Sequence, residues 1–355
     1  MIKINDALKQ WTIHQAHEIG IDKIGFTHAG NFESLRQQMT RQKERGFTSG
    51  FEHDNLDERL DPTLIFDEPK SIISIALAYP NRILNPGDPK PDGKVRGAFS
   101  TASWGLDYHH ILNQKMAELI ERLKEKAGHQ LRFKPMVDTG ALVDVAVAQR
   151  AGLGFIGKNG LLITPEFGSF VYLGEIITNI EFTPDAPFIG DCGECRACIK
   201  ACPPKALFGD GTMNAKKCLS YQTQAKEMIP LEDRKKIRNM IYGCDICQTV
   251  CPYNKGIDFH NHPEMEPDYE AVMPVLEDLL QMSNQVFKER FGHMAGSWRG
   301  KKVLQRNAII ALANKKSDRS LPLLQALVDK DPRPDIREIA QWAINELNRQ
   351  TKRDN

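Results

Sequence analysis

Apolar and polar positions along the first half of the chain follow the spacing of short, alternating helices and strands. Mostly apolar runs such as residues 71–79 are typical of buried strands, whereas the helical spacing of apolar positions over residues 3–19 indicates an amphipathic helix. The pattern predicts helices over residues 3–19, 109–126 and 140–151, strands over residues 24–27, 71–79, 131–137 and 170–180, and a proline- and glycine-rich loop over residues 81–93. We therefore expect a sheet covered by helices, an α/β domain, over residues 1–185.

The pattern changes twice after this domain. Residues 186–258 hold every cysteine of the chain, and residues 265–355 have helical patterning throughout. Within this tail, residues 306–312 are echoed by residues 337–344, with another helix start between them. The echo fits either a HEAT-like repeat or an ordinary helical hairpin. The sequence thus predicts a multidomain protein of α/β and α+β type with a helical C-terminal domain.

Composition narrows the class of protein. The 355 residues are 41% hydrophobic and 26% charged, as in soluble globular proteins, and the net charge of +1 excludes a polybasic nucleic-acid coat. No apolar run approaches the roughly 20 residues that span a membrane, and the N-terminus lacks the apolar core of a secretory signal. We expect a cytoplasmic monomer without structural disulfides.

The eight cysteines form two runs with a ferredoxin spacing. The first is Cys192-x2-Cys195-x2-Cys198-x3-Cys202-Pro203, the second is Cys244-x2-Cys247-x3-Cys251-Pro252, and Cys218 lies between them. In two-cluster ferredoxins the cysteine before the proline ligates the other cluster. The spacing therefore predicts two 4Fe–4S clusters. The ligands of one are Cys192, Cys195, Cys198 and Cys251, and those of the other are Cys202, Cys218, Cys244 and Cys247. Zinc is the main alternative, but zinc sites usually show two separated C-x2-C pairs.

Two further motifs each have a structural and a functional reading. Gly152-x-Gly154-x-x-Gly157 matches a dinucleotide-binding pattern, but it follows a predicted helix and leads into a turn, so we interpret it as a tight connection. Asp138 ends a predicted strand, where a buried carboxyl could serve as a general acid. It could equally cap the following helix.

A local basic stretch lies in the helical tail. Six basic residues and one acidic residue fall between Lys288 and Arg306, with Trp298 among them. Such a stretch could be a phosphate-binding face or only a solvated surface. The candidate RNA-binding residues are Arg299, Lys301, Lys302 and Arg306.

Taken together, these residues resemble the epoxyqueuosine reductases, which act in the last step of queuosine synthesis in tRNA. The resemblance covers nearly the whole chain. It rests on the segments Val137-Asp138-Thr139-Gly140, Ala148 to Asn159, Phe167-Gly168-Ser169, Cys218 to Thr223 and Tyr242 to Gln248, besides the cysteine runs.

The resemblance implies a reductase with cobalamin and two 4Fe–4S clusters, built from three domains. Residues 1–185 would be a cobalamin-binding domain similar to reductive dehalogenases. Residues 186–258 would be a ferredoxin-like domain, and residues 265–355 a HEAT-like domain that binds the tRNA anticodon stem-loop. Electrons from an unidentified low-potential donor would pass through the clusters to cobalamin. The substrate would be epoxyqueuosine at the wobble position of the tRNAs for Asp, Asn, His and Tyr.

The resemblance also assigns residues to roles. Asp138 matches the proton donor, which also lies at the cofactor. The segments that line cobalamin in the family match Arg59, Lys158, Asn159, Gly168, Ser169 and Ser220. One departure is Ser103-Trp104, where the family usually has an arginine motif.

Other functions remain open at this point. A cobalamin-dependent reductase of a small molecule would not need the basic tail. A simple electron carrier would bind no corrin, and a helical RNA-binding adaptor would not need the cysteines.

Overall fold

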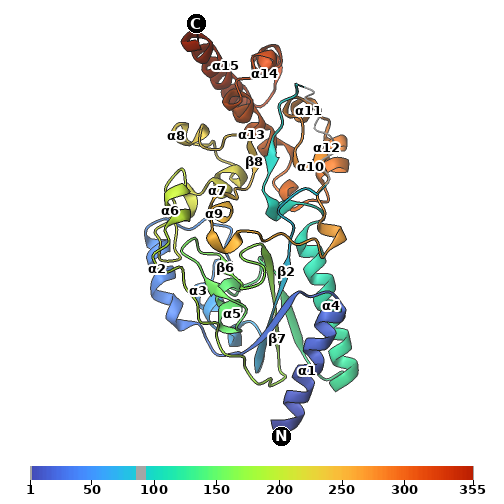
Figure 1. The fold of residues 1–355 in the computed structure, drawn as a ribbon. Coiled ribbons are helices and arrows are strands. Elements are labelled where there is room, and N and C mark those ends of the chain that lie inside the picture. Colours follow the sequence, from blue (N-terminus) through green and yellow to red (C-terminus); the bar gives the residue numbers. More distant parts are fainter. Residues whose placement is uncertain (1, 85–92, 355) are drawn as a thin grey trace. The chain divides into compact units, whose positions relative to one another are not determined.

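The computed structural model describes residues 2–84 and 93–354, in the element order shown in Figure 1. Most of the predicted loop over residues 81–93 therefore lies outside the described residues. The α-helices are α1 (Ile2–Glu18), α2 (Arg36–Glu44), α3 (Leu56–Leu60), α4 (Tyr108–Ala127), α5 (Asp144–Arg150), α6 (Ala197–Ala201), α7 (Leu219–Gln224), α8 (Leu231–Arg234), α9 (Ile246–Thr249), α10 (Tyr269–Val272), α11 (Leu276–Gln281), α12 (Asn284–Phe291), α13 (Lys301–Asn314), α14 (Leu321–Lys330) and α15 (Pro334–Asp354). The strands are β1 (Lys23–His28), β2 (Ser71–Ala78), β3 (Ala98–Phe99), β4 (Phe133–Met136), β5 (Phe155–Ile156), β6 (Leu162–Ile163), β7 (Val171–Thr178) and β8 (Met240–Tyr242).

The chain forms two compact units, each assembled from three separate segments. The first unit comprises Met1–Asn81, Tyr108–Lys216 and Ile246–Glu264, and the second comprises Arg82–Asp107, Lys217–Asp245 and Met265–Asn355. This division differs from the three consecutive domains expected from the sequence. The second unit gathers distant segments because β3 pairs with β8 in parallel and α13 packs against β8.

A four-stranded sheet in the order β1-β2-β7-β4 is the centre of the first unit. All three strand pairs are antiparallel, so this unit is α+β, whereas an α/β domain was expected. The predicted strands themselves are confirmed. Edge strand β4 contains Pro135, which lacks an N–H and is tolerated at a sheet edge.

Helices cover both faces of this sheet, as the pattern predicted. On one face, Ile72 of β2 belongs to the same buried cluster as Val147 of α5. On the other face, Gly174 of β7 leaves room for Leu112 and Met116 of α4. Helix α4 in turn packs beside α1 (Figure 1). This two-sided burial explains why all eight residues of β2 are buried and six of them are apolar.

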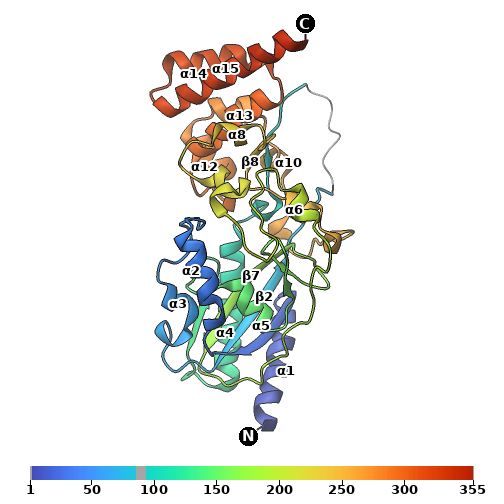
Figure 2. The same ribbon diagram turned by 90° about the vertical axis from the view of Figure 1, so that its left-hand side faces the viewer.

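Helix α13 is the core of the second unit. It is buried along nearly its whole length and contacts β8, α7, α11 and α15. Helices α14 and α15 lie side by side (Figure 2). The two segments that echo each other in sequence fall in α13 and α15, which pack together. Within the described ranges, no helix is both long and apolar enough to cross a lipid bilayer.

Candidate active site and metal centre

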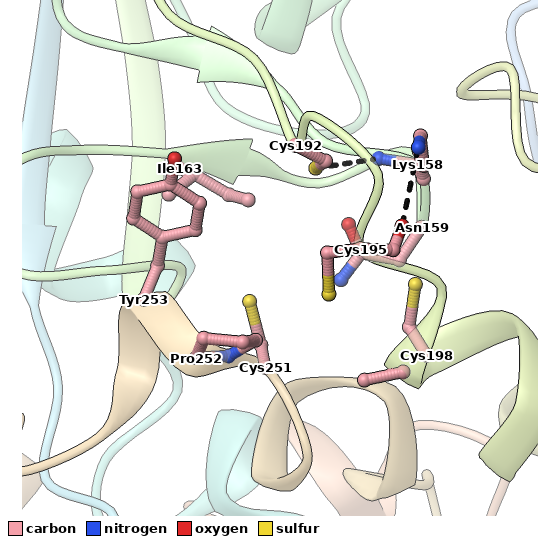
Figure 3. A pocket seen from close by; sticks show the side chains of 10 residues that line it. Lys158, Asn159, Ile163, Cys192, Cys195, Cys198, Cys251, Pro252 and Tyr253 are labelled. Atoms are coloured by element: carbon pink, nitrogen blue, oxygen red, sulfur yellow. Dashed lines mark hydrogen bonds between the residues drawn. The ribbon is translucent and has the colours of Figure 1, made fainter.

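Four cysteines from two distant segments surround one hollow in the first unit. Cys192, Cys195, Cys198 and Cys251 line it together with Tyr253 and the turn after β5 (Figure 3). Burial raises the pKa of the Cys198 thiol, and the nearby thiols of Cys192 and Cys251 add to the rise because their charges would repel. These are the four cysteines that the spacing assigned to one cluster.

Backbone turns hold these cysteines in place. Cys195 N–H donates to the Cys192 carbonyl at 3.0 Å, and α6 begins directly before Cys198. Lys158 N–H donates to Cys192 Sγ at 3.4 Å, and Lys158 Nζ donates to the carbonyl of Cys195 at 3.1 Å. A set of four half-buried thiols that also receives a backbone N–H fits the thiolate ligands of a 4Fe–4S cluster.

The fourth cysteine is positioned by a buried network of side chains. Asn254 Oδ1 accepts from Ser169 N–H at 2.8 Å, and Asn254 Nδ2 donates to the carbonyl of Gln248 at 2.8 Å. Ser169 Oγ donates to Gln248 Oε1 at 2.9 Å. Cβ on Gly168 would lie 2.2 Å from Asn254 Oδ1, so only glycine fits there. Gly168 and Ser169 thus anchor the segment that carries Cys251, although the resemblance implied that they line cobalamin.

The other four cysteines are divided between the two units. Cys202 ends α6 and accepts a hydrogen bond from Ala206 N–H at 3.3 Å, and Cys247 lies in α9, which packs against α6. In the second unit, Cys218 precedes α7 and Cys244 follows β8. Their assignment to one cluster remains a prediction.

Asp138 lies at the end of β4 in an unusual backbone conformation. Its φ is +49°, and Thr139 N–H donates back to the Val137 carbonyl across it. Its carboxylate side chain is 63% exposed. Tyr108 Oη donates to Asp138 Oδ2 at 3.0 Å, and His109 Nε2 is 3.6 Å from the same oxygen. Asp138 is therefore not a helix cap, since α5 begins only at Asp144 with Val143 as its N-cap.

Two carboxyl groups, those of Asp144 and Glu175, form a pair next to the Asp138 backbone. Asp144 Oδ2 accepts from the Asp138 N–H at 3.1 Å, and burial raises the pKa of Asp144 to about 6. Glu175 of β7 is 1% exposed, and burial together with the Asp144 charge raises its pKa well above the usual value. The charge of Asp144 also acts on Arg59, whose pKa is lowered by burial. The predicted Arg59 thus lies near Asp144, which accepts from the Asp138 N–H.

Several residues of this site were not found from the sequence. Tyr108 precedes a predicted helix and His109 begins it, so neither was singled out, and Glu175 was noted only for its distance from the glycine motif. The mostly apolar sequence of β7 held a signal for Glu175, because a carboxyl inside an otherwise buried strand needs a partner. The glycine motif itself enters the β5–β6 hairpin, which confirms its interpretation as a tight connection.

The predicted RNA-binding residues differ in how far they face solvent. Trp298 is 51% exposed, Arg299 lies over its ring at 3.8 Å, and Lys302 is exposed beside Asp335. Half-buried Lys301 donates to the Met282 carbonyl at 2.8 Å.

Arg306 corrects the sequence analysis. It is 3% exposed, and its guanidinium donates to the carbonyls of Gln222, Ala225 and Glu227. Arg306 therefore holds the loop after α7 and cannot present its charge to a phosphate.

Two other residues of the second unit were singled out from the sequence. Ser220 accepts from Gln224 Nε2 within α7 at 3.2 Å. Ser103 and Trp104, which replace the family's arginine motif, are buried and donate to the carbonyls of Ser100 and Phe99. The positions of the missing arginine motif therefore belong to the core of this unit.

Comparisons with known proteins agree with the predicted chemistry. Residues 59–139 match the family model described as "Epoxyqueuosine reductase QueG, DUF1730", and residues 191–254 match a "4Fe-4S double cluster binding domain". The epoxyqueuosine reductase of Lactococcus garvieae is 52% identical over 343 residues, 96% of each chain.

Solved structures show the same fold. A crystal structure of an epoxyqueuosine reductase with an epoxyqueuosine-modified tRNA-Tyr stem loop has a TM-score of 0.93 and 53% identity, covering 96% of this chain and 90% of that one. A Bacillus subtilis epoxyqueuosine reductase whose aspartate-bearing catalytic loop is swung out of the active site has a TM-score of 0.92 and 50% identity, with the same coverage.

Proposed function

The chain belongs to the epoxyqueuosine reductase family, and from this premise we propose that it reduces epoxyqueuosine to queuosine in tRNA. The observation that carries the proposal is identity of 52% across 96% of both chains to a curated member. The related enzyme that was solved with a modified tRNA-Tyr stem loop supports tRNA as the substrate. By the family resemblance, the target is the wobble nucleotide of the tRNAs for Asp, Asn, His and Tyr.

The reaction sets a clear requirement for electrons and protons. Converting an epoxide to an alkene breaks two C–O bonds and releases the oxygen as water, which consumes two electrons and two protons. When bound, cobalamin and the clusters supply the electrons. The protein must supply a proton to the departing oxygen, because an alkoxide is a poor leaving group.

Asp138 is the proton donor in this proposal. Its carboxyl is exposed, so it can contact a substrate, and solvent water can reprotonate it after each turnover. Tyr108 and His109 hold Oδ2 in place, while the Asp138 backbone is tied to Asp144. The catalytic loop of the Bacillus subtilis enzyme also carries an aspartate, which supports an acid on a loop at this position.

The residues around Asp138 fit a cofactor that is held by hydrogen bonds. Arg59, Tyr108 and His109 offer donors, and His109 Nε2 lies near Asp138. These side chains would hold the cobalamin that the family resemblance implies. We assign Arg59, Asp138, Gly168 and Ser169 to the cobalamin site, and Gly168 and Ser169 also support the segment that carries Cys251. The likeness of this domain to reductive dehalogenases stays a prediction.

The two clusters follow the partition derived from spacing. Cys192, Cys195, Cys198 and Cys251 ligate one, and their common hollow supports this set. Cys202, Cys218, Cys244 and Cys247 ligate the other. Iron–sulfur clusters deliver electrons singly, which suits a two-electron reaction that proceeds in two steps.

Trp298, Arg299 and Lys302 are the proposed contacts to the tRNA. They combine an exposed ring with two cations beside the start of α13. Aromatic and basic side chains are the usual partners of unpaired bases and phosphates. The surrounding helices α13, α14 and α15 form the proposed HEAT-like domain.

Complementation tests the function in a cell that supplies cofactors and electrons. A bacterial strain that accumulates epoxyqueuosine because it lacks this reductase is transformed with the gene for this chain. Nucleoside mass spectrometry of its tRNA should show queuosine, a product lighter by one oxygen. Persistent epoxyqueuosine, despite a folded and cluster-loaded protein, would contradict the proposal.

A further inference from the structure

The turn between β5 and β6 directs an amide group into the cysteine hollow. Asn159 is only 4% exposed and lines the hollow together with Cys195 and Cys198 (Figure 3). Its Oδ1 accepts from Leu161 N–H at 3.3 Å. Its Nδ2 is buried and has no hydrogen-bond partner among the described residues. A buried donor without a partner is destabilising, so a bound acceptor in the hollow would remove this cost.

The same turn holds Asn159 in one position. Gly157 N–H donates to the Leu161 carbonyl at 2.8 Å, and Gly160 N–H donates to the Gly157 carbonyl at 2.9 Å. Gly160 has a φ of +81°, which favours glycine. A Cβ on Gly157 would lie 2.8 Å from Asn159 Oδ1, so a larger residue there would displace the amide. The local sequence is therefore suited to place this side chain.

The preceding residue already serves the cysteines. Lys158 N–H donates to Cys192 Sγ, and Lys158 Nζ donates to the carbonyls of Gly193 and Cys195. Lys158 and Asn159 thus act on the cysteine loop, although the resemblance alone had suggested a role for both in lining cobalamin.

We propose that Asn159 Nδ2 donates a hydrogen bond to a sulfur atom of the 4Fe–4S cluster held by Cys192, Cys195, Cys198 and Cys251, and so raises its reduction potential. The reduced cluster carries one more negative charge than the oxidised cluster, so an N–H donor stabilises the reduced form more. Asn159 is a positioning and tuning residue in this account. The inference rests on the cluster ligands of the proposed function.

A redox titration of the intact protein tests the inference. Wild type and the Asn159→Leu variant, both reconstituted anaerobically with iron and sulfide, are titrated with dithionite while EPR follows each cluster. Loss of one hydrogen bond to a charged acceptor should lower the equilibrium constant for reduction of the cluster about tenfold. For one electron this is a shift of the reduction potential by about 59 mV to lower values. Only one of the two clusters should shift.

Two further variants make the result decisive. Asn159→Ala removes the donor with a smaller side chain and adds no charge, so its potential should also fall even if the leucine variant folds poorly. Asn113→Leu removes an exposed amide on α4 and should leave both potentials unchanged. Unchanged potentials in cluster-loaded Asn159 variants would overturn the inference. Absence of any 4Fe–4S signal from wild type would instead overturn the proposed cluster ligands.

Discussion

The positive φ of Asp138 favours an aspartate or asparagine at this position of the chain. Left-handed backbone is uncommon outside glycine, and aspartate and asparagine tolerate it best. The close turn from Val137 to Thr139 turns the carboxyl outward at the end of β4. Such strain persists where the surrounding structure enforces it, often at functional sites. Here the enforcing contacts are the bond to Asp144 and the helix start at Tyr108.

Asp138→Asn should abolish turnover while keeping the backbone conformation. The amide cannot supply the proton, so the reduction rate should fall by roughly 10²–10⁴. Binding of tRNA and cobalamin should be unchanged, which fluorescence binding and absorption spectra would show. The exposed Asp54→Asn variant is the matched control. An asparagine variant within twofold of the wild-type rate would remove Asp138 from this role.

Asp144 should make the protein less stable as the pH rises towards neutrality. Burial raises its folded pKa from 3.8 to about 6, so the stability it contributes is fully present below pH 3.8 and is lost as the pH passes 6. Asp144→Asn should lose less stability between pH 4 and 7 than the parent, by on the order of 2–3 kcal/mol. Urea unfolding of the cluster-free proteins at both pH values measures the difference. Parallel pH dependences for parent and variant would contradict the buried pair.

Sequence reasoning found residues whose chemistry is encoded in spacing. The cysteines that line the hollow could be assigned because their ligand geometry fixes the intervals between them. Arg306 and Gly168 could not, because their roles depend on distant carbonyls and on Asn254. A basic residue in a basic stretch looks like a surface residue until its burial is known. Likewise, Glu175 became interpretable only when its neighbour Asp144 was known.

At the scale of elements, the hairpin β5–β6 and the segment before β7 form a support for the cysteines. The hairpin presents Lys158 and Asn159, and Gly168 and Ser169 hold Asn254. Neither feature follows from apolar periodicity, since both strands of the hairpin have only two residues. Longer strands and helices were predictable because their apolar faces repeat, but the antiparallel pairing of the sheet was not.

Gly168→Ala should loosen the cluster held by Cys251. Its Cβ would meet Asn254 Oδ1 at 2.2 Å and displace the side chain that fixes this segment. Gly256→Ala is the matched control, because Gly256 also has a positive φ but nothing lies within 4 Å of its Cβ. Both variants carry roughly 1–2 kcal/mol of backbone strain. Iron analysis should show a loss for Gly168→Ala alone, and equal iron content in both variants would contradict this support.

At the scale of the whole molecule, the two compact units share the functional residues. Residues 217–245 carry two cysteines yet belong to the second unit, together with the helical tail. Changes in composition along the chain can predict only consecutive domains. They could not reveal units built from separate segments, because the pairing of β3 with β8 joins residues that lie far apart in sequence. The basic tail and residues 217–245 of the cysteine-rich segment are thus parts of one folded unit, whereas the other cysteines belong to the first unit.

Substitution of the residues proposed to contact the tRNA should weaken tRNA binding and leave the protein folded. Arg299→Ala with Lys302→Ala removes two cations from the exposed face, so tRNA affinity should fall and its salt dependence should flatten by about 0.7–0.9 per lost phosphate contact. Filter binding at several salt concentrations measures both. Lys330→Ala, on exposed α14, is the control. An unchanged salt dependence in the double variant would place the tRNA elsewhere.

The central claim is the reduction of epoxyqueuosine in tRNA by this chain. The most direct measurement incubates the purified, anaerobically reconstituted protein with cobalamin, a low-potential reductant and tRNA carrying epoxyqueuosine, followed by nucleoside mass spectrometry. The account predicts queuosine, lighter than the substrate by one oxygen, and only when all components are present. Unaltered epoxyqueuosine with both clusters intact and cobalamin bound would contradict it.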